Sequence, residues 1–161
     1  MAGPSGTRRG WKFDPAGRMS AVYNDTEVFD FDANDVEFSF PVLSKNADGA
    51  IGYSTGAGGA VTQVTNATTA VTINKPCGQI TTVALTTAAA AEEAFVVNNS
   101  LVDANDVIVV NTTYAGGGKP VVFVTNVGAG VFTVNISNVH ASAALNAVLV
   151  VNFAVIKGVV A

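Results

Sequence analysis

The sequence has few of the residues that most often carry catalysis, metal binding or redox chemistry. Its 161 residues include one cysteine, Cys77, and one histidine, His140. A single cysteine excludes a disulfide within the chain and any site built from several cysteines. A zinc site needs three or four His, Cys or carboxylate ligands, and His140 has no carboxylate close to it in sequence. We therefore expect no catalytic histidine, no metal and no cofactor, and we expect Cys77 to be a small apolar residue of the core.

Charged residues are also scarce, at 12% of the chain against 49% hydrophobic residues, with a net charge of -4. From residue 60 onward the charged residues are Lys75, Lys119, Lys157, Glu92, Glu93, Asp103 and Asp106. The acidic balance argues against general binding of nucleic acid, which needs a surplus of Lys and Arg. Glu92 and Glu93 are adjacent, so on a strand they would point to opposite sides, which does not suit a glycosidase pair. The sequence therefore does not predict an enzyme.

Long apolar runs are missing too. The longest ones are broken within about ten residues by Asn, Thr, Gly or Lys, whereas a membrane-spanning helix needs about 20. The basic residues near the N-terminus have no apolar stretch behind them, so they do not form a secretory signal. We expect a protein that is made in the cytoplasm and does not bind a membrane.

The sequence is rich in Val, Ala and Ile, a bias that favours strands over helices. Short β-type runs follow residue 59 at intervals of about ten residues, separated by Gly, Asn, Asp or Pro. They lie at 60–64, 70–73, 79–85, 94–98, 107–111, 120–126, 130–137 and 147–156. Residues 88–93 have room for one helical turn at most. We predict an all-β chain in which 59–161 is an antiparallel β-sandwich or jelly-roll-like domain.

Residues 20–58 are predicted to hold a few extra strands and a Gly-rich connector. Apolar and polar residues alternate over 26–32 and 36–43, as they do in strands with one wet face. The acids of this region suggest calcium, but they lack the glycine and terminal glutamate of a calcium loop. The phrase Asp-Ala-Asn-Asp-Val occurs at 32–36 and again at 103–107. We interpret both copies as turns, because Asp and Asn suit turns on their own account.

Residues 1–19 are basic and rich in Gly and Pro, with Trp and Phe as their large apolar residues. Such a segment has too little apolar surface to form a core by itself. We predict a flexible or partner-contacting arm, and the alternative is a terminus with no partner. The candidate partner-binding residues are Arg8, Arg9, Trp11, Lys12 and Phe13, since Arg and aromatic side chains are enriched at interfaces.

Three phrases carry a resemblance to a known group of proteins. They are Gly59-Ala-Val-Thr-Gln-Val-Thr65, Ala70-Val-Thr-Ile-Asn-Lys-Pro-Cys-Gly-Gln-Ile-Thr81 and Val151-Asn-Phe-Ala-Val-Ile-Lys-Gly158. In these phrases the chain resembles small virion proteins of tailed bacteriophages, which are capsid decoration (cement) proteins or fibre-associated structural proteins. The resemblance covers about the last hundred residues, fades between Ala84 and Ala147, and does not extend to the first 58.

The resemblance implies a non-catalytic protein of the virion that binds the major capsid protein on the outer capsid surface and stabilises the head. It also implies a homo-oligomer, a trimer over three-fold positions of the shell. A Val-rich, charge-poor surface is compatible with this, because copies of the chain can bury it together. The alternative is a tail- or head-fibre protein with a receptor- or carbohydrate-binding role. Stacking aromatic residues on exposed loops would favour this alternative, yet Tyr114 is the only aromatic residue of the last hundred that we expect on a loop.

Overall fold

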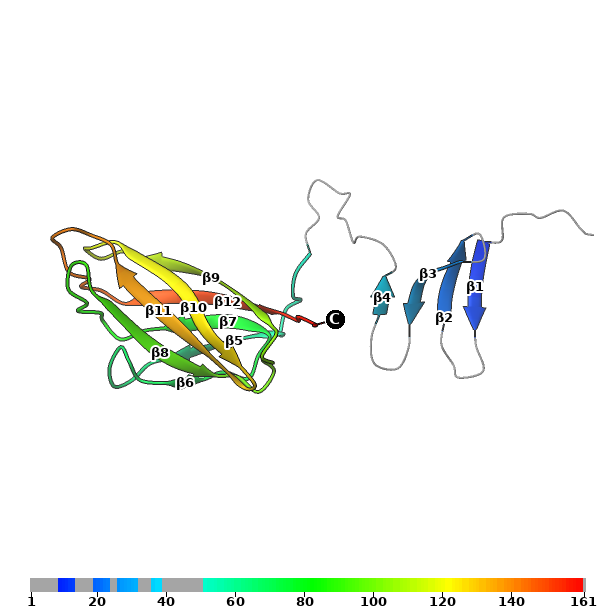
Figure 1. Cartoon of the computed structure of the whole chain (residues 1–161), viewed down its shortest axis with the longest axis horizontal. Coiled ribbons are helices and arrows are strands. Elements are labelled where there is room, and N and C mark those ends of the chain that lie inside the picture. The colour runs from blue at the N-terminus through cyan, green and yellow to red at the C-terminus, as the bar shows by residue number, and fades with distance from the viewer. Residues whose placement is uncertain (1–8, 14–18, 24–25, 32–35, 39–50, 161) are drawn as a thin grey trace, which may run out of the picture. The chain divides into compact units, whose positions relative to one another are not determined.

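A computed structural model describes residues 9–13, 19–23, 26–31, 36–38 and 51–160, with side chains described for 51–160. The chain divides into two compact units, Met1–Ile51 and Gly52–Ala161. Every regular element within the described ranges is a strand, so the prediction of an all-β chain is confirmed (Figure 1). In these ranges no helix is long and apolar enough to span a membrane.

The first unit contains a four-stranded antiparallel sheet in the order β1-β2-β3-β4. Its strands are β1 (Arg9–Phe13), β2 (Met19–Tyr23), β3 (Thr26–Phe31) and β4 (Val36–Phe38). The last two correspond to the strands predicted at 26–32 and 36–43, and the turn predicted at 32–35 lies outside the described residues.

Strand β1 falls within the segment predicted to be an arm. It pairs along its whole length with β2, from Arg9 opposite Tyr23 to Phe13 opposite Met19. Residues 9–13 therefore form a strand, which the sequence did not predict, and contact of this segment with a partner stays a prediction. Antiparallel pairing orders a segment through backbone hydrogen bonds to its neighbour, which a short basic sequence can make as well as an apolar one.

The second unit holds eight strands in two four-stranded sheets, β5-β7-β12-β9 and β10-β11-β8-β6. Each of the eight β-type runs recognised in the sequence overlaps one of them. They are β5 (Gly58–Thr62), β6 (Val71–Thr72), β7 (Cys77–Thr81), β8 (Glu92–Asn98), β9 (Val107–Tyr114), β10 (Pro120–Gly128), β11 (Val131–Asn138) and β12 (Leu149–Ile156). Residues 88–91 form a turn, closed by a 3.2 Å hydrogen bond from Ala91 N to Ala88 O, before β8 begins.

Two of the strand pairs are parallel, β5 with β7 and β6 with β8. The prediction of a purely antiparallel arrangement is therefore wrong for these pairs. The cause is that β5, β6, β7 and β8 alternate between the two sheets. Two successive reversals of the chain restore its direction, so each strand returns to its sheet parallel to the one it joins.

One hydrophobic core lies between the two sheets. It draws on both, with Val97, Val134 and Ile136 from one and Ile80, Val151 and Val155 from the other. Phe132 of β11 and Phe153 of β12 meet across it, with ring centroids 5.7 Å apart. Figure 1 shows β10 and β11 in front of β12. Each fully buried Val, Ile or Phe contributes roughly 1.5–3 kcal/mol, so this sandwich-like core holds the unit together.

The second unit starts before the boundary predicted near 59. The hydroxyl of Tyr53 donates a hydrogen bond to Val155 O of β12, and a 3.2 Å bond from Ala57 N to Ser54 O closes a turn. The predicted Gly-rich connector is therefore partly fastened to the last strand. Cys77 also differs from prediction, because it lies half-buried in β7 rather than in the core.

Candidate functional site

The outer face of the β5-β7-β12-β9 sheet carries no charged side chain at the outward positions of its four strands. Alternation along each strand sends every second residue outward, and in each strand these are the more exposed positions. The outward residues are Gly58, Ala60, Thr62, Cys77, Gln79, Thr81, Val107, Val109, Asn111, Thr113, Val150, Asn152, Ala154 and Ile156. We call this set the uncharged face.

A row of amides crosses the middle of the uncharged face. Gln79 Nε2 donates to Asn152 Oδ1 at 2.9 Å, and Asn152 Nδ2 donates to Asn111 Oδ1 at 2.9 Å. The register explains the row, because Asn152 stands directly opposite both Gln79 and Asn111. Cross-strand pairs of this kind stabilise a sheet and fix its register. The polar groups of the face are thereby ordered into one line.

Apolar side chains occupy the two rows that follow the amides on one side, toward the end of β12. Ile156 stands opposite Val107, and Ala154 stands opposite Val109. Val107, Ile156 and Val109 are 57%, 54% and 50% exposed. A shallow hollow of about 180 Å³ lies where the apolar and amide rows meet. Water-exposed β-branched side chains in adjacent rows form a surface that can be buried against a partner at little cost.

The outer face of the other sheet is similar but contains one charge. Its outward residues in β8, β10 and β11 include Val96, Val121, Phe123, Thr125, Thr133 and Asn135, and Glu92 stands at one end. Phe123 is 38% exposed and pairs with Asn135. Asn135 Nδ2 donates to Thr125 Oγ1 at 2.7 Å. Phe123 is the exposed aromatic residue of this face.

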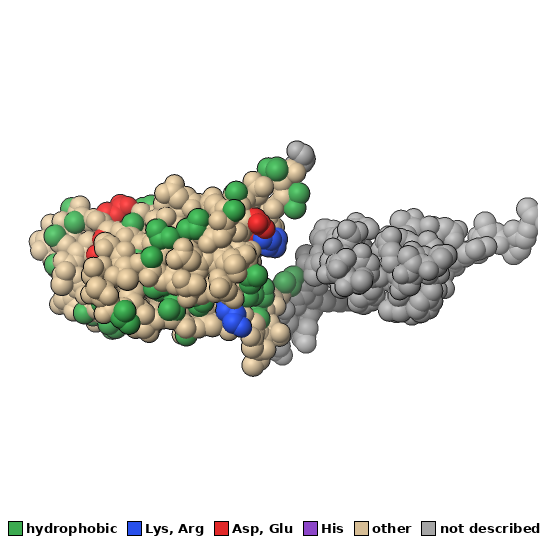
Figure 2. Space-filling view, turned by 90° about the horizontal axis from the view of Figure 1, so that it is seen from below, with side chains coloured by type: hydrophobic (Ala, Val, Ile, Leu, Met, Phe, Trp, Pro, Cys, Tyr) green, Lys and Arg blue, Asp and Glu red, His purple; other side chains and the backbone are tan. Residues whose placement is uncertain are grey.

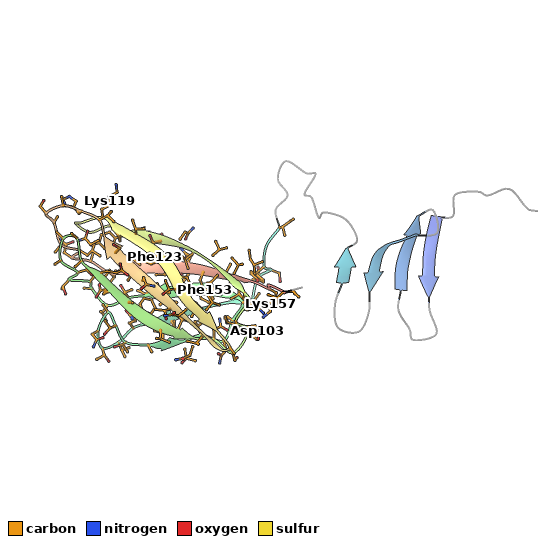
Figure 3. The ribbon with its side chains drawn as sticks, in the orientation of Figure 1. Asp103, Lys119, Phe123, Phe153 and Lys157 are labelled. Atoms are coloured by element: carbon orange, nitrogen blue, oxygen red, sulfur yellow. The ribbon has the colours of Figure 1, made fainter. Side chains whose placement is uncertain are left out.

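The charged side chains of the second unit lie at its two ends. Figure 3 places Lys119 at the end opposite Lys157 and Asp103, and in the view of Figure 2 the red and blue side chains lie toward the ends. Lys157 Nζ donates to Asp103 Oδ2 at 2.6 Å, to Asp106 Oδ2 at 2.7 Å and to Leu101 O at 3.1 Å. We call these four residues the terminal clasp, because they join the end of β12 to the 101–106 loop.

Asp106 is the centre of the terminal clasp, and its side chain is fully covered. Besides the Lys157 ammonium, its carboxylate accepts backbone N–H bonds from Asp103 at 2.8 Å and Gly158 at 3.1 Å. The hydrogen bond from Lys157, together with these backbone donors, lowers the pKa of Asp106 from 3.8 to about 2. The hydrogen bonds to Asp103 and Asp106 in turn raise the pKa of Lys157. The predicted Asp103–Asp106 turn is confirmed by a 3.1 Å bond from Asp106 N to Asp103 O.

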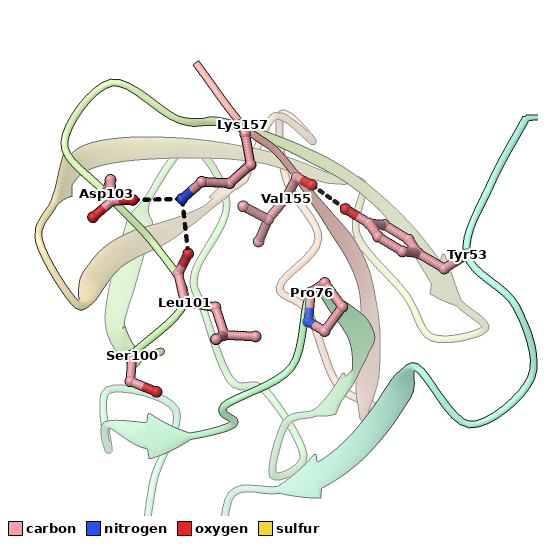
Figure 4. A pocket seen from close by; sticks show the side chains of 7 residues that line it. All are labelled: Tyr53, Pro76, Ser100, Leu101, Asp103, Val155 and Lys157. Atoms are coloured by element: carbon pink, nitrogen blue, oxygen red, sulfur yellow. Dashed lines mark hydrogen bonds and ion pairs between the residues drawn. The ribbon is translucent and has the colours of Figure 1, made fainter. Parts of the chain in front are cut away.

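A pocket of about 500 Å³ adjoins the clasp. Figure 4 shows Tyr53, Pro76, Leu101 and Val155 around it, with Lys157 at its rim. Its walls are mainly apolar, and two of its polar side chains are paired: Tyr53 Oη bonds to Val155 O, and Lys157 bonds to its carboxylates. Such a pocket can accept an apolar side chain, but it offers no activated nucleophile or base.

Asn138 organises the other end of the unit. This fully buried amide lies within hydrogen-bond distance of Thr87 O (3.1 Å), Ala88 O (3.0 Å) and Ala143 O (2.8 Å) through Nδ2. Its Oδ1 accepts from Lys119 N at 3.1 Å and His140 N at 3.2 Å. Three loops, those before β8, before β10 and after β11, therefore meet at one side chain.

The residues considered for chemistry in the sequence are not brought together. His140 lies on a loop, where its Nδ1 accepts N–H bonds from Ser142 at 3.1 Å and Ala143 at 2.9 Å. Glu93 accepts a hydrogen bond from Thr87 Oγ1, whereas Glu92 is exposed at the start of β8. In the part of the chain that the structure describes, no three or more His, Cys, Asp or Glu residues cluster to hold a metal.

The predicted partner-binding residues lie in the first unit. Arg9, Trp11, Lys12 and Phe13 belong to β1, and Arg8 lies outside the described residues.

The expectation for Tyr114 is wrong. It ends β9, and its hydroxyl donates to Gly117 O at 2.7 Å and accepts from Asn146 N at 2.8 Å, so it is held in place rather than free on a loop.

The uncharged face was not predicted from the sequence, although the alternation of residues along β9 was visible there. Val107, Val109, Asn111 and Thr113 alternate with the residues that turn inward. Alternation alone does not say which set faces the core, and both sets of this strand begin with β-branched residues. Exposure and register in the folded unit decide it.

No protein-family model matches this sequence, and neither a curated protein nor a solved structure is significantly similar to it.

Proposed function

We propose that this chain is a non-catalytic structural protein of a bacteriophage virion, a decoration (cement) protein that binds the major capsid protein on the outer surface of the shell and stabilises the head. Its second unit acts as an adhesive module, a β-sandwich with jelly-roll-like connections. The chain works as a homo-oligomer, for which the resemblance of its last hundred residues to such proteins implies a trimer.

The distribution of charge on the second unit is the observation that carries this proposal. Outward positions on the two sheets include one charged residue, Glu92, whereas Lys157, Asp103 and Asp106 form a cluster at one end. Interface cores are depleted of charge because a charge that loses its water must find a partner. One broad face without a charge and a second with a single charge at its end suit a protein that works by adhering.

The first unit supplies the proposed attachment to the shell. Within β1, Arg9, Trp11, Lys12 and Phe13 combine positive and aromatic residues on a strand at one end of the sheet order, and Arg8 precedes them. Arg and aromatic side chains are the commonest anchors of protein interfaces. In this scheme the first unit binds the shell, and the faces of the second unit contact other copies of the chain and capsid subunits.

Reconstitution on heads that lack this protein tests the proposal. Purified full-length chain should co-sediment with such heads, appear on the outer surface in a reconstruction, and raise the temperature at which they release DNA. Failure to bind heads whose other components are intact would contradict it.

A matched pair of charge reversals tests the attachment residues. Arg9→Glu should lower occupancy on heads, because it places an acid at the proposed contact, whereas Lys119→Glu, at the end of the second unit opposite the terminal clasp, should leave occupancy unchanged. Equal occupancy for both variants would remove β1 from the attachment.

A second function, recognition of a host receptor or carbohydrate by a fibre, is favoured by one observation. Phe123 is an exposed aromatic beside the amide of Asn135, and an aromatic ring next to a hydrogen-bonding amide is a combination that ligand sites use. Phe123→Ala should then abolish adsorption to host cells while leaving head stability unchanged.

A further inference from the structure

We propose that the uncharged face of the β5-β7-β12-β9 sheet is the surface on which a second copy of this chain docks. This inference deepens the proposed function and rests on it, because it names the part of the adhesive module that joins copies to one another. The contact runs over the amide row of Gln79, Asn152 and Asn111 and the apolar rows beside it.

Charge favours a second copy as the occupant. A face with no charged side chain among fourteen outward positions offers nothing to steer an acidic or basic partner. Two copies of one chain have the same sign of net charge, here -4. Contact between copies is therefore least unfavourable where the charges are absent, and on the second unit that is this face rather than the charged ends.

The chemistry of the rows also fits a copy of the same chain. Each amide of the central row carries both donors and acceptors, so amide groups can meet amide or peptide groups of a neighbour without leaving either unpaired. Val107, Val109 and Ile156 supply the apolar area, with about half of each side chain still exposed. Burial of that area contributes roughly 25 cal/mol per Å² before the costs of association.

The area of the uncharged face sets how tightly two copies are expected to associate. Its strands are five residues long in β5 and β7 and eight in β9 and β12. With strands about 4.8 Å apart and about 3.3 Å of rise per residue, the face projects roughly 400–500 Å². Two partners then bury on the order of 1,000 Å² in total, at the lower limit of specific interfaces. Association through this face is therefore expected to depend on concentration.

The chain carries its own probe of this contact. Cys77, its only cysteine, lies half-buried on the uncharged face, in register with Ala154 and beside Gly58. A neighbour docked on the face would shield the thiol. The rate of Cys77 modification by a small thiol reagent should therefore fall as the protein associates.

The experiment measures mass and Cys77 modification together on the full chain, from about 1 to about 100 μM, a range that brackets a contact of this size. We expect mass to rise and the modification rate to fall over the same range. Association with an unchanged modification rate would overturn the inference, and so would a monomer at every concentration. A monomer whose Cys77 is protected at all dilutions would also overturn it, because the face would then be covered within the chain.

Two matched variants locate the contact. Val109→Lys places a charge in the uncharged face, and Val121→Lys places one on the other sheet at a similar exposure, 50% against 44%. A buried unpaired charge weakens an interface strongly, so Val109→Lys should weaken association by at least about tenfold. Val121→Lys should leave it unchanged. Both positions are exposed, and equal melting temperatures would show that both variants fold. Equal association by the two variants would overturn the inference.

Binding to heads is measured separately, so that the two proposals can fail independently. If the wild-type chain associates through Val109 but does not bind heads, the docking face stands and the decoration role falls. If heads bind the Val109→Lys and wild-type chains with the same occupancy and both are monomers in solution, the decoration role stands and the docking face falls.

Discussion

The faces and the ends of the second unit differ in charge, although the same strands run through both. Along β12, Asn152 and Ala154 lie on a face without charge, and three residues after Ala154 the chain reaches Lys157 in a cluster with Asp103 and Asp106. The faces leave apolar and amide groups open for contact, whereas at the clasp end the carboxylates are held in one fixed arrangement. The residues that carry the proposed adhesion are therefore different from those of the clasp, so adhesion and stability can be perturbed separately.

Composition draws a second contrast, between the two units. Thirteen of the twenty charged residues fall in the first 51 residues, although these make up less than a third of the chain. Solubility thus depends on the first unit more than on the second. A chain reduced to residues 52–161 is therefore expected to aggregate more readily than the full chain.

The largest expected effect is the difference in stability lost when a core ring and a surface ring are removed. Phe132→Ala removes a fully buried ring that packs on Phe153, and it should destabilise the unit by about 3–5 kcal/mol. Phe123→Ala removes a partly exposed ring on the neighbouring strand and should cost less than about 1 kcal/mol. Urea denaturation of both variants measures the difference. Similar losses would mean that Phe123 contributes to the core and is not available on the face.

The next largest expected effect is the loss of stability when the buried Asn138 side chain is removed. Asn138→Ala leaves the carbonyls of Thr87, Ala88 and Ala143 without their shared donor, and should cost about 2–3 kcal/mol. Asn146→Ala is the control, because Asn146 is exposed and accepts a single 2.6 Å bond from Gly117 N, so water can replace its side chain. Thermal denaturation should show a clear loss of Tm for the first variant and little for the second. Equal Tm values would contradict the buried network.

The smallest expected effect is a loss of stability at low pH, when the carboxylates of the terminal clasp are protonated. Asp106 has a pKa of about 2 in the folded unit against 3.8 as its ordinary value. A lowered carboxylate pKa gives a stabilisation that is complete above about pH 4 and is lost as the pH falls toward 2. Lys157 has a raised pKa, so its contribution is present at neutral pH and is lost only under strongly alkaline conditions.

Asp106→Asn should therefore lower Tm at pH 7 and flatten its decline between pH 4 and pH 2. Asp103→Asn provides the comparison, because the Asp103 side chain is 71% exposed whereas that of Asp106 is fully covered. High salt should screen the Asp103 contact more than the covered Asp106 contact. A wild-type Tm profile in Asp106→Asn would show that the clasp does not stabilise the folded unit.

The sequence predicted the strands of the second unit well because each one is a short β-type run with its own punctuation. The run at 120–126 contains most of β10, and the run at 130–137 coincides with β11 to within a residue. Strand β1 was not predicted because its pairing with β2 depends on backbone bonds that any side chain permits. The uncharged face was not predicted because the two sides of β9 look alike in composition.

By itself the sequence determined the all-β class, the approximate positions of the eight strands of the second unit and the scarcity of His, Cys and charged residues, because local propensity and composition act within a few residues. Only the tertiary structure decided which strands run parallel, that Lys157 meets Asp103 and Asp106, and that Tyr114 and Cys77 lie where they do. These features join residues far apart in the chain, and their register is set by burial of one shared core.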